Sequence, residues 1–75
     1  MPNLPTVTAK KLIKVVCKKG YILQRVHGSH HIFVHKEKRI VISIPVHPGH
    51  DLGRGITLAI LKDAQITIDE FKSLV

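Results

Sequence analysis

The spacing of apolar residues changes twice along the chain, and these changes constrain the possible fold more than any other feature of the sequence. Residues 8–19 carry apolar side chains three and four positions apart, which is typical of a helix. Residues 21–46 contain three short runs rich in β-branched and aromatic residues, which predict strands. The helical spacing returns over residues 56–65. The predicted order is therefore a helix, three consecutive strands and a second helix.

The first helix has recognisable signals at both ends. The hydroxyl of Thr8 can accept a backbone N–H of the first turn. Lys18 and Lys19 suit the negative end of the helix dipole, and Gly20 can adopt the left-handed conformation that ends many helices. Residues 1–7 contain two prolines and are expected to form an irregular leader.

The three strands are predicted at residues 21–27, 30–36 and 40–46. Short polar breaks at residues 28–29 and 37–39 separate them. Such connections are too short for a parallel crossover, so the strands are expected to form an antiparallel sheet. With the helices packed on one face of this sheet, the chain is predicted to be a two-layer α+β domain.

Alternation along a strand assigns its side chains to two faces of the sheet. Three isoleucines of the third strand are predicted to share one face: Ile40, Ile42 and Ile44. In the second strand, His30 shares a face with Ile32 and Val34, so His30 is expected at the edge of the core. His31 and His35 share the opposite face and are expected to be solvated.

The C-terminal part is predicted to be helical. Four apolar residues are expected to line one face of the helix over residues 56–65: Ile56, Ala59, Ile60 and Ala64. Thr67 and Glu70 have the spacing of a capping box, which predicts a short third helix that ends near Leu74.

The size and composition of the chain fit one small folded domain over residues 1–75. Hydrophobic residues make up 44% of the sequence, which argues against disorder. A single cysteine, Cys17, excludes an intramolecular disulfide and fits a reducing cytosol. No apolar run approaches the roughly 18 residues that a membrane span needs. A cytoplasmic protein that does not span a membrane is therefore expected.

The charge balance indicates a polyanionic partner. Twelve lysines and arginines oppose five acidic residues, which gives a net charge of +7 with the histidines neutral. Nucleic acid, an acidic membrane surface and an acidic protein are the partner classes that such an excess favours.

Histidines are concentrated in one short stretch, residues 27–35. Four of the six histidines lie there: His27, His30, His31 and His35. Zinc sites need three or four converging ligands, usually with cysteines. Strand alternation points His30 away from His31 and His35, and Cys17 has no partner thiol. Neither a metal site nor another cofactor is therefore expected.

Two interpretations of His30 remain open from the residues alone. Periodicity favours a histidine at the core edge that is satisfied by a hydrogen bond. Alternatively, its imidazole can act as an acid or base near neutral pH and take a proton from a ribose 2′-hydroxyl. Nearby lysines and arginines would then stabilise the charge on phosphorus, with no metal required. DNA lacks this hydroxyl and would not be cleaved.

The sequence resembles the HicA toxins, the YcfA-like group of small bacterial mRNA interferases. The resemblance rests on KKGY, QRVHGSHHIF, IPVHPGHDLGRG and ILKDAQITIDEF, in the family's order from about Pro5 to Leu74. It implies a fold similar to double-stranded-RNA-binding domains and cleavage of mRNA without the ribosome. It also implies a HicB-type antitoxin as partner, which covers the active site.

The resemblance also assigns residues. The family's catalytic histidine falls on His30, within the motif Gly28-Ser29-His30, and His47 falls on a second recurring histidine. Independently of the resemblance, the positive charge of the chain makes five basic residues candidates for holding the RNA backbone: Lys36, Lys38, Arg39, Arg54 and Lys62. Family members often have Gly-Thr-Leu-Arg where this chain has residues 55–58, with Ile56 and Leu58 as the departures, and Gln65 stands where glycine is usual.

These observations lead to three hypotheses about function. The leading hypothesis is the toxin of a type II toxin–antitoxin system, acting as a metal-independent endoribonuclease. The alternative is a non-catalytic RNA-binding module of the same fold, and the third is an adaptor that binds an acidic protein. Replacing His30 with alanine separates the first two, because a nuclease would lose cleavage and keep salt-sensitive RNA binding.

Overall fold

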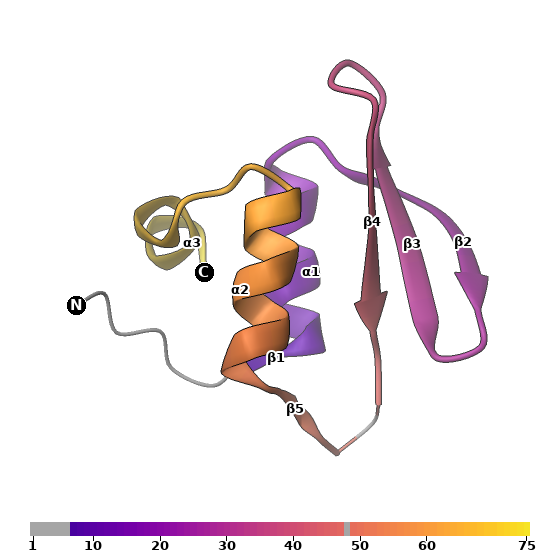
Figure 1. Cartoon of the computed structure of the whole chain (residues 1–75), viewed down its shortest axis with the longest axis vertical. Coiled ribbons are helices and arrows are strands. Elements are labelled where there is room, and N and C mark those ends of the chain that lie inside the picture. The colour runs from indigo at the N-terminus through magenta and orange to yellow at the C-terminus, as the bar shows by residue number, and fades with distance from the viewer. Residues whose placement is uncertain (1–6, 48) are drawn as a thin grey trace.

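The computed structural model describes residues 7–47 and 49–75 and has two layers, with helices on one side of a three-stranded sheet (Figure 1). Its elements are β1 (Val7–Thr8), α1 (Ala9–Lys18), β2 (Ile22–His27), β3 (His30–His35), β4 (Ile40–Pro45), β5 (Asp51–Leu52), α2 (Arg54–Asp63) and α3 (Ile68–Leu74). The predicted α+β order of helix, three strands and helix is confirmed, as is the short third helix.

A two-stranded pair, which the sequence did not predict, joins the start of α1 to the segment before α2. Val7 pairs with Leu52 and Thr8 with Asp51. Val7 therefore belongs to a strand, so the predicted irregular leader is wrong at this residue; the rest of that leader lies outside the described residues. The pair holds the connection between β4 and α2 against the beginning of α1 (Figure 1).

The main sheet is antiparallel with the strand order β2-β3-β4. Gly28 forms the tight β2–β3 turn with a φ of +62°, a conformation that glycine adopts at no steric cost. Arg39 closes the β3–β4 turn, where its backbone N–H donates to the carbonyl oxygen of His35 at 2.7 Å. β2 lies farthest from the helices, and all six of its residues are exposed (Figure 1).

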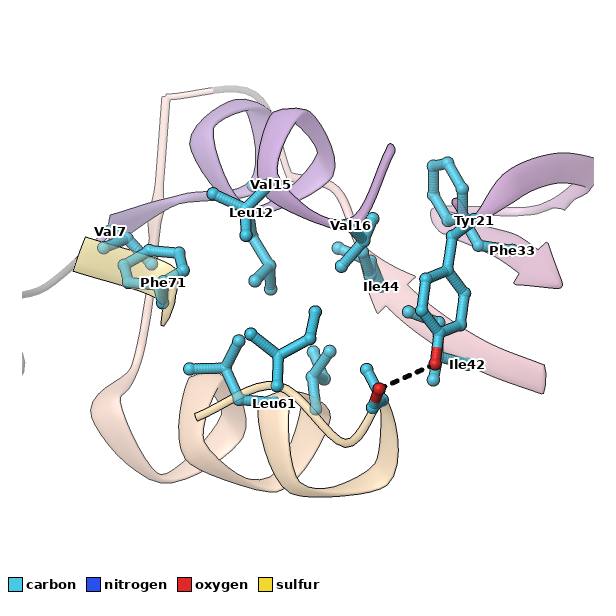
Figure 2. Close-up of a cluster of buried hydrophobic side chains, with 14 of the residues drawn as sticks. Val7, Leu12, Val15, Val16, Tyr21, Phe33, Ile42, Ile44, Leu61 and Phe71 are labelled. Carbon is cyan, nitrogen blue, oxygen red and sulfur yellow. Dashed lines mark hydrogen bonds between the residues drawn. The ribbon is translucent and has the colours of Figure 1, made fainter. Parts of the chain in front are cut away.

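The core lies between the helices and the inner face of the sheet (Figure 2). Its large buried side chains include Leu12, Val15 and Val16 of α1, Phe33, Ile42 and Ile44 of the sheet, Leu61 of α2 and Phe71 of α3. Burying each such side chain stabilises the fold by about 1.5–3 kcal/mol. The hydroxyl of Tyr21 donates to the carbonyl oxygen of Ala64 at 2.8 Å, which ties the start of β2 to the end of α2 (Figure 2).

The observed register reverses the predicted faces of β3. Phe33 is 2% exposed and pairs with the buried Ile42, so the face of Phe33 is the core face. His31 and His35 share this face and are half-buried, so the prediction that both are solvated is wrong. His30 is exposed on the opposite face, so its predicted place at the core edge is also wrong.

The physical reason for this reversal is a weak alternation in β3. Ile32, Phe33 and Val34 are consecutive apolar residues, so either face of the strand can be buried. Phe33 removes the largest apolar area from water when it enters the core, and this decides the orientation of the strand. Ile32 and Val34 are left half-buried on the outer face.

Helix α2 begins two residues earlier than predicted and buries a different face. Ile60 and Ala64 are buried as expected, but Ile56 and Ala59 are exposed. Thr57 is fully buried instead, because its hydroxyl donates to the carbonyl oxygen of Gly53 at 3.0 Å and so leaves no unsatisfied polar atom.

Helices α1 and α2 end in the same hydrogen-bonded turn. Gly20 follows α1 with a φ of +97°, and Gln65 follows α2 with a φ of +59°. In both turns the next backbone N–H donates to a carbonyl oxygen five residues back, from Tyr21 to Val16 and from Ile66 to Leu61. Non-glycine residues in left-handed conformation cost about 1–2 kcal/mol, so Gln65 stands where glycine is favoured.

The predicted starts of the first and third helices are confirmed. Thr8 accepts the backbone N–H of Lys11 through its hydroxyl, and Thr67 and Glu70 form the capping box of α3. Over residues 7–47 and 49–75, no helix has the length and apolar character needed to cross a membrane.

Candidate active site

His30 stands at the first position of β3, directly after the two-residue turn Gly28-Ser29. The turn brings His27, the last residue of β2, opposite His30 in the antiparallel ladder. A Cβ added to Gly28 would meet no atom within 4 Å, so Gly28 is needed for its positive φ and not for close packing. The turn therefore places the His30 imidazole at an open corner of the sheet.

Ser43 of β4 fixes the orientation of this imidazole. The Oγ of Ser43 and the Nδ1 of His30 lie 3.2 Å apart, across the outer face of the sheet. Both residues are exposed, and their side chains share this face because β3 and β4 pair in regular antiparallel register.

The hydrogen bond leaves the second ring nitrogen of His30 available for chemistry. When Nδ1 carries the proton and donates it to the Ser43 oxygen, Nε2 has a free lone pair and can accept a proton. When the Ser43 hydroxyl donates instead, Nε2 carries the proton and can donate it. The same contact thus supports a base or an acid at Nε2.

His47 lies next to this corner, just beyond the end of β4. It lines a pocket of about 330 Å³ together with His50, Lys10 and Asp51. The backbone N–H of Val46 donates to the carbonyl oxygen of Ser29 at 2.7 Å, which joins the rim of the pocket to the β2–β3 turn. The structure therefore brings the second motif histidine to the His30 end of the sheet.

The five predicted RNA-contacting residues are all exposed, but they lie on different parts of the molecule. Lys36, Lys38 and Arg39 belong to the β3–β4 turn, at the opposite end of β3 from His30. Five residue steps separate His30 from His35, or about 17 Å along the strand. Arg54 opens α2, which begins at the end of the molecule where β3 also begins (Figure 1). Lys62 lies in the last turn of α2.

The remaining histidines of the cluster do not converge with His30. His31 faces the core, and its Nδ1 is buried without a hydrogen-bond partner among the described residues. His35 packs against Tyr21 with ring centroids 5.2 Å apart. In the two described segments, 7–47 and 49–75, no group of three or more histidine, cysteine or acidic side chains is placed to hold a metal ion.

Sequence reasoning did not find Ser43, His50 or Lys10 as parts of this region. Ser43 carried a detectable signal, because it is the outward-facing residue between Ile42 and Ile44 in an alternating strand. Lys10 and His50 are far apart in sequence, and they line the same pocket because β1 pairs with β5. No local sequence pattern predicted this pairing.

Two titratable groups on other elements have shifted pKa values. The pKa of Glu70 is lowered from 4.5 to about 2, first by the hydrogen bond from Lys19 and then by that from the backbone N–H of Thr67. Burial raises the pKa of the Tyr21 phenol. Both groups serve the packing of the helices: Glu70 joins α3 to the end of α1, and Tyr21 joins β2 to α2.

Comparison with known proteins gives a family match. The model of a family described as HicA toxin of bacterial toxin–antitoxin matches residues 9–66, which is most of the chain and includes His30, Ser43 and His47. No curated protein matches the chain.

Proposed function

Since the chain belongs to the HicA toxin family of bacterial toxin–antitoxin systems, we propose that it is an endoribonuclease that cleaves mRNA with His30 as its catalytic residue. The observation that carries this proposal is the exposed His30 imidazole, whose Nδ1 is held by Ser43 while Nε2 faces away from that contact. An imidazole sealed in the core would not reach a docked strand, and His30 is on the outer face instead.

The proposed reaction starts with the Nδ1–H of His30 donated to Ser43. Nε2 then removes the proton of a ribose 2′-hydroxyl, and the 2′-oxygen forms a bond to the adjacent phosphorus. The bond from phosphorus to the 5′-oxygen of the next nucleotide breaks, and that oxygen takes up a proton. The products are a 2′,3′-cyclic phosphate and a 5′-hydroxyl, with no change in oxidation state. His47 is the candidate donor of the second proton.

Basic residues supply the electrostatic part of the proposal. Arg54 opens α2, which begins at the end of the molecule where β3 also begins, and it is the candidate for stabilising the phosphate under attack (Figure 1). Lys36, Lys38 and Arg39 follow His35, which is about 17 Å from His30 along β3, so their proposed contact is with more distant phosphates. Lys62 is proposed to contact the backbone near the far end of α2.

Two departures from the family pattern bear on RNA binding. Ile56 and Leu58 are 50% and 41% exposed, so the first turns of α2 present apolar side chains where polar ones are usual in the family. The hydroxyl of Thr57 faces the core and is engaged with Gly53. In this chain the start of α2 therefore relies on Arg54 for any contact with phosphate.

Family membership implies an antitoxin partner, and we take this partner to be a HicB-type protein that covers His30. The exposed corner formed by the β2–β3 turn and the end of β4 gives such a protein direct access to the imidazole. With mRNA as substrate, the site of action is the cytoplasm.

The test is cleavage of a synthetic RNA by His30→Ala, with His27→Ala as the matched control. His27 is also an exposed histidine and is the pairing partner of His30, so its loss changes the same hairpin without removing the proposed base. We expect His30→Ala to lower the cleavage rate by about 10²–10⁴, and His27→Ala to stay within a few-fold of the wild type.

Equal cleavage by wild type and His30→Ala would remove His30 from the mechanism. Salt-sensitive RNA binding without any cleavage by the wild type would favour the alternative, a binding module. EDTA is expected to leave the rate unchanged, since no proposed step uses a metal.

A further inference from the structure

The exposed side of α1 is an arc of lysines with one cysteine among them. Lys10, Lys11, Lys14 and Lys18 are exposed, and so is Cys17. At 100° per residue these five positions cover about 120° of the helix circumference, and Lys10 and Lys18 are about 12 Å apart along its axis. We call these four lysines the α1 arc.

The positive charge of the α1 arc is not neutralised by the rest of the described structure. The sequence of α1 contains no acidic residue. Within residues 7–47 and 49–75, none of the four lysines forms an ion pair with an acidic side chain, whereas the neighbouring Lys19 pairs with Glu70. The Nζ of Lys18 donates to the backbone carbonyl oxygen of Leu74 at 2.9 Å, which leaves its charge without an acidic partner among these residues. Lysines four positions apart repel each other and destabilise a helix slightly, and a bound polyanion would relieve this repulsion.

Exposed apolar side chains lie elsewhere. The large exposed hydrophobic residues of the described chain are Ile22, Leu23, Val26, Val41, Ile56, Leu58 and Val75, and none belongs to α1. The centres of protein–protein interfaces are rich in aromatic and apolar residues and poor in lysine. The composition of the α1 arc therefore fits the backbone of a nucleic acid better than the surface of a protein.

The α1 arc is continuous with the His30 end of the sheet. Lys10 lines the same pocket as His47 and His50, and this pocket is joined to the Gly28-Ser29 turn by the backbone bond from Val46 to Ser29. The start of α1, β5 and the end of β4 lie together at one end of the molecule (Figure 1). Asp51 also lines the pocket and is the acidic group on this path.

We propose that the α1 arc binds the phosphate backbone of the RNA strand that extends from His30 past His47, without regard to base sequence. The inference rests on the proposed function in taking RNA as the ligand, and it adds a surface that the predicted basic residues do not include. Lysines act as flexible point charges toward phosphate, so such contacts give affinity and salt dependence but no base specificity.

Cys17 provides a test that needs no substitution in the arc. It is the single cysteine of the chain and is exposed between Lys14 and Lys18. The rate of its alkylation by a maleimide is measured on His30→Ala, which keeps the RNA intact, with increasing amounts of single-stranded RNA. The proposal expects a saturable slowing of at least several-fold at a fixed pH and salt concentration.

A second measurement compares two double variants of equal charge. Lys10→Gln/Lys14→Gln removes two charges from the arc, and Lys36→Gln/Lys38→Gln removes two from the β3–β4 turn. RNA affinity is measured at several salt concentrations in the His30→Ala background. For a single strand, each lost phosphate contact lowers the magnitude of the slope of log K against log salt by about 0.7. Loss of two contacts in the arc variant should therefore lower this slope by up to about 1.4. The decrease in the turn variant should be smaller.

The outcomes separate this inference from the proposed function. Protection of Cys17 by RNA together with a smaller salt slope for the arc variant supports the α1 arc, even if the wild type cleaves nothing. RNA that binds without slowing alkylation, or protection by an acidic protein and not by RNA, overturns it, even if His30 is confirmed as the catalytic residue.

Discussion

The two ends of β3 each carry a histidine, and the two have opposite surroundings. His30 begins the strand on the outer face, exposed, with its Nδ1 3.2 Å from the hydroxyl of Ser43. His35 ends the strand on the inner face, half-buried, with its ring at 77° to that of Tyr21. An odd number of steps separates them, and this alone sends them to different faces of the sheet.

The contacts of His35 are those of a structural residue. Its Nδ1 accepts the backbone N–H of Lys38 at 3.2 Å, which closes the β3–β4 turn. Its ring also lies so close to Gly20 that a Cβ there would stand 3.0 Å from Nε2. Both ring nitrogens are thus occupied or crowded, whereas His30 keeps one nitrogen open. The surroundings of a histidine, and not its presence in a cluster, therefore decide which role it can take.

The largest effect that would sharpen this comparison is on stability. His35→Ala removes an aromatic contact and a hydrogen bond, each worth about 0.5–1.5 kcal/mol, so we expect the free energy of unfolding to fall by about 2 kcal/mol. Urea denaturation of the His35→Ala and His30→Ala variants measures this difference.

His30→Ala is expected to change the same free energy by no more than about 0.5 kcal/mol, because its side chain is exposed. The folded fraction of His35→Ala should cleave RNA at close to the wild-type rate. Equal destabilisation by both variants, or a catalytic loss in His35→Ala as large as in His30→Ala, would break the comparison.

The next effect concerns the orientation of His30. Ser43→Ala removes the hydrogen bond that holds Nδ1, and we expect kcat/KM to fall about tenfold, or about 1.4 kcal/mol in activation free energy. Ser43→Thr keeps the hydroxyl and suits a strand, so it should restore most of the rate. The pH profile of the cleavage rate should shift in Ser43→Ala and return in Ser43→Thr.

A positioning role for Ser43 fails if alanine and threonine variants have equal rates and equal pH profiles. Denaturation curves serve as the control, since an exposed serine should affect stability little.

The smallest expected effect is the dependence of the free energy of unfolding on the ionisation of Glu70. Because the folded pKa of Glu70 is lowered to about 2, its stabilising contribution is complete above its ordinary value of 4.5 and is lost as the pH falls toward 2. Unfolding free energy should therefore decline modestly over this acid range. Glu70→Gln retains an acceptor for the capping box and should flatten the decline, and an unchanged slope would contradict the assignment.

Local signals in the sequence predicted the frame of the fold well. Thr8 and the Thr67-to-Glu70 capping box start helices as expected, and Gly20 ends α1 in left-handed conformation. These features depend on neighbours within five positions, so a short stretch of sequence contains all that is needed. Gln65 follows α2 in the same left-handed conformation, but because it is not a glycine, this conformation was not predicted from the sequence.

Features that depend on distant contacts were not predictable in this way. The faces of β3 were reversed because three consecutive apolar residues fit either orientation, and burial of Phe33 beside Ile42 decided between them. Ser43 reaches His30 only through that register. Motif similarity nevertheless singled out His30, because the Gly28-Ser29 turn and the histidine after it are contiguous.

The central claim is that His30 takes a proton from a ribose 2′-hydroxyl. Its most direct test compares cleavage of two RNAs by the wild-type protein. The first RNA has one preferred cleavage site, and the second is identical except for a single 2′-deoxyribose at the nucleotide 5′ to that site. Loss of that cut alone, with a 2′,3′-cyclic phosphate at the end of the unmodified product, is the predicted result. Continued cleavage next to the deoxyribose would contradict the account, because no 2′-oxygen would then be needed as the nucleophile.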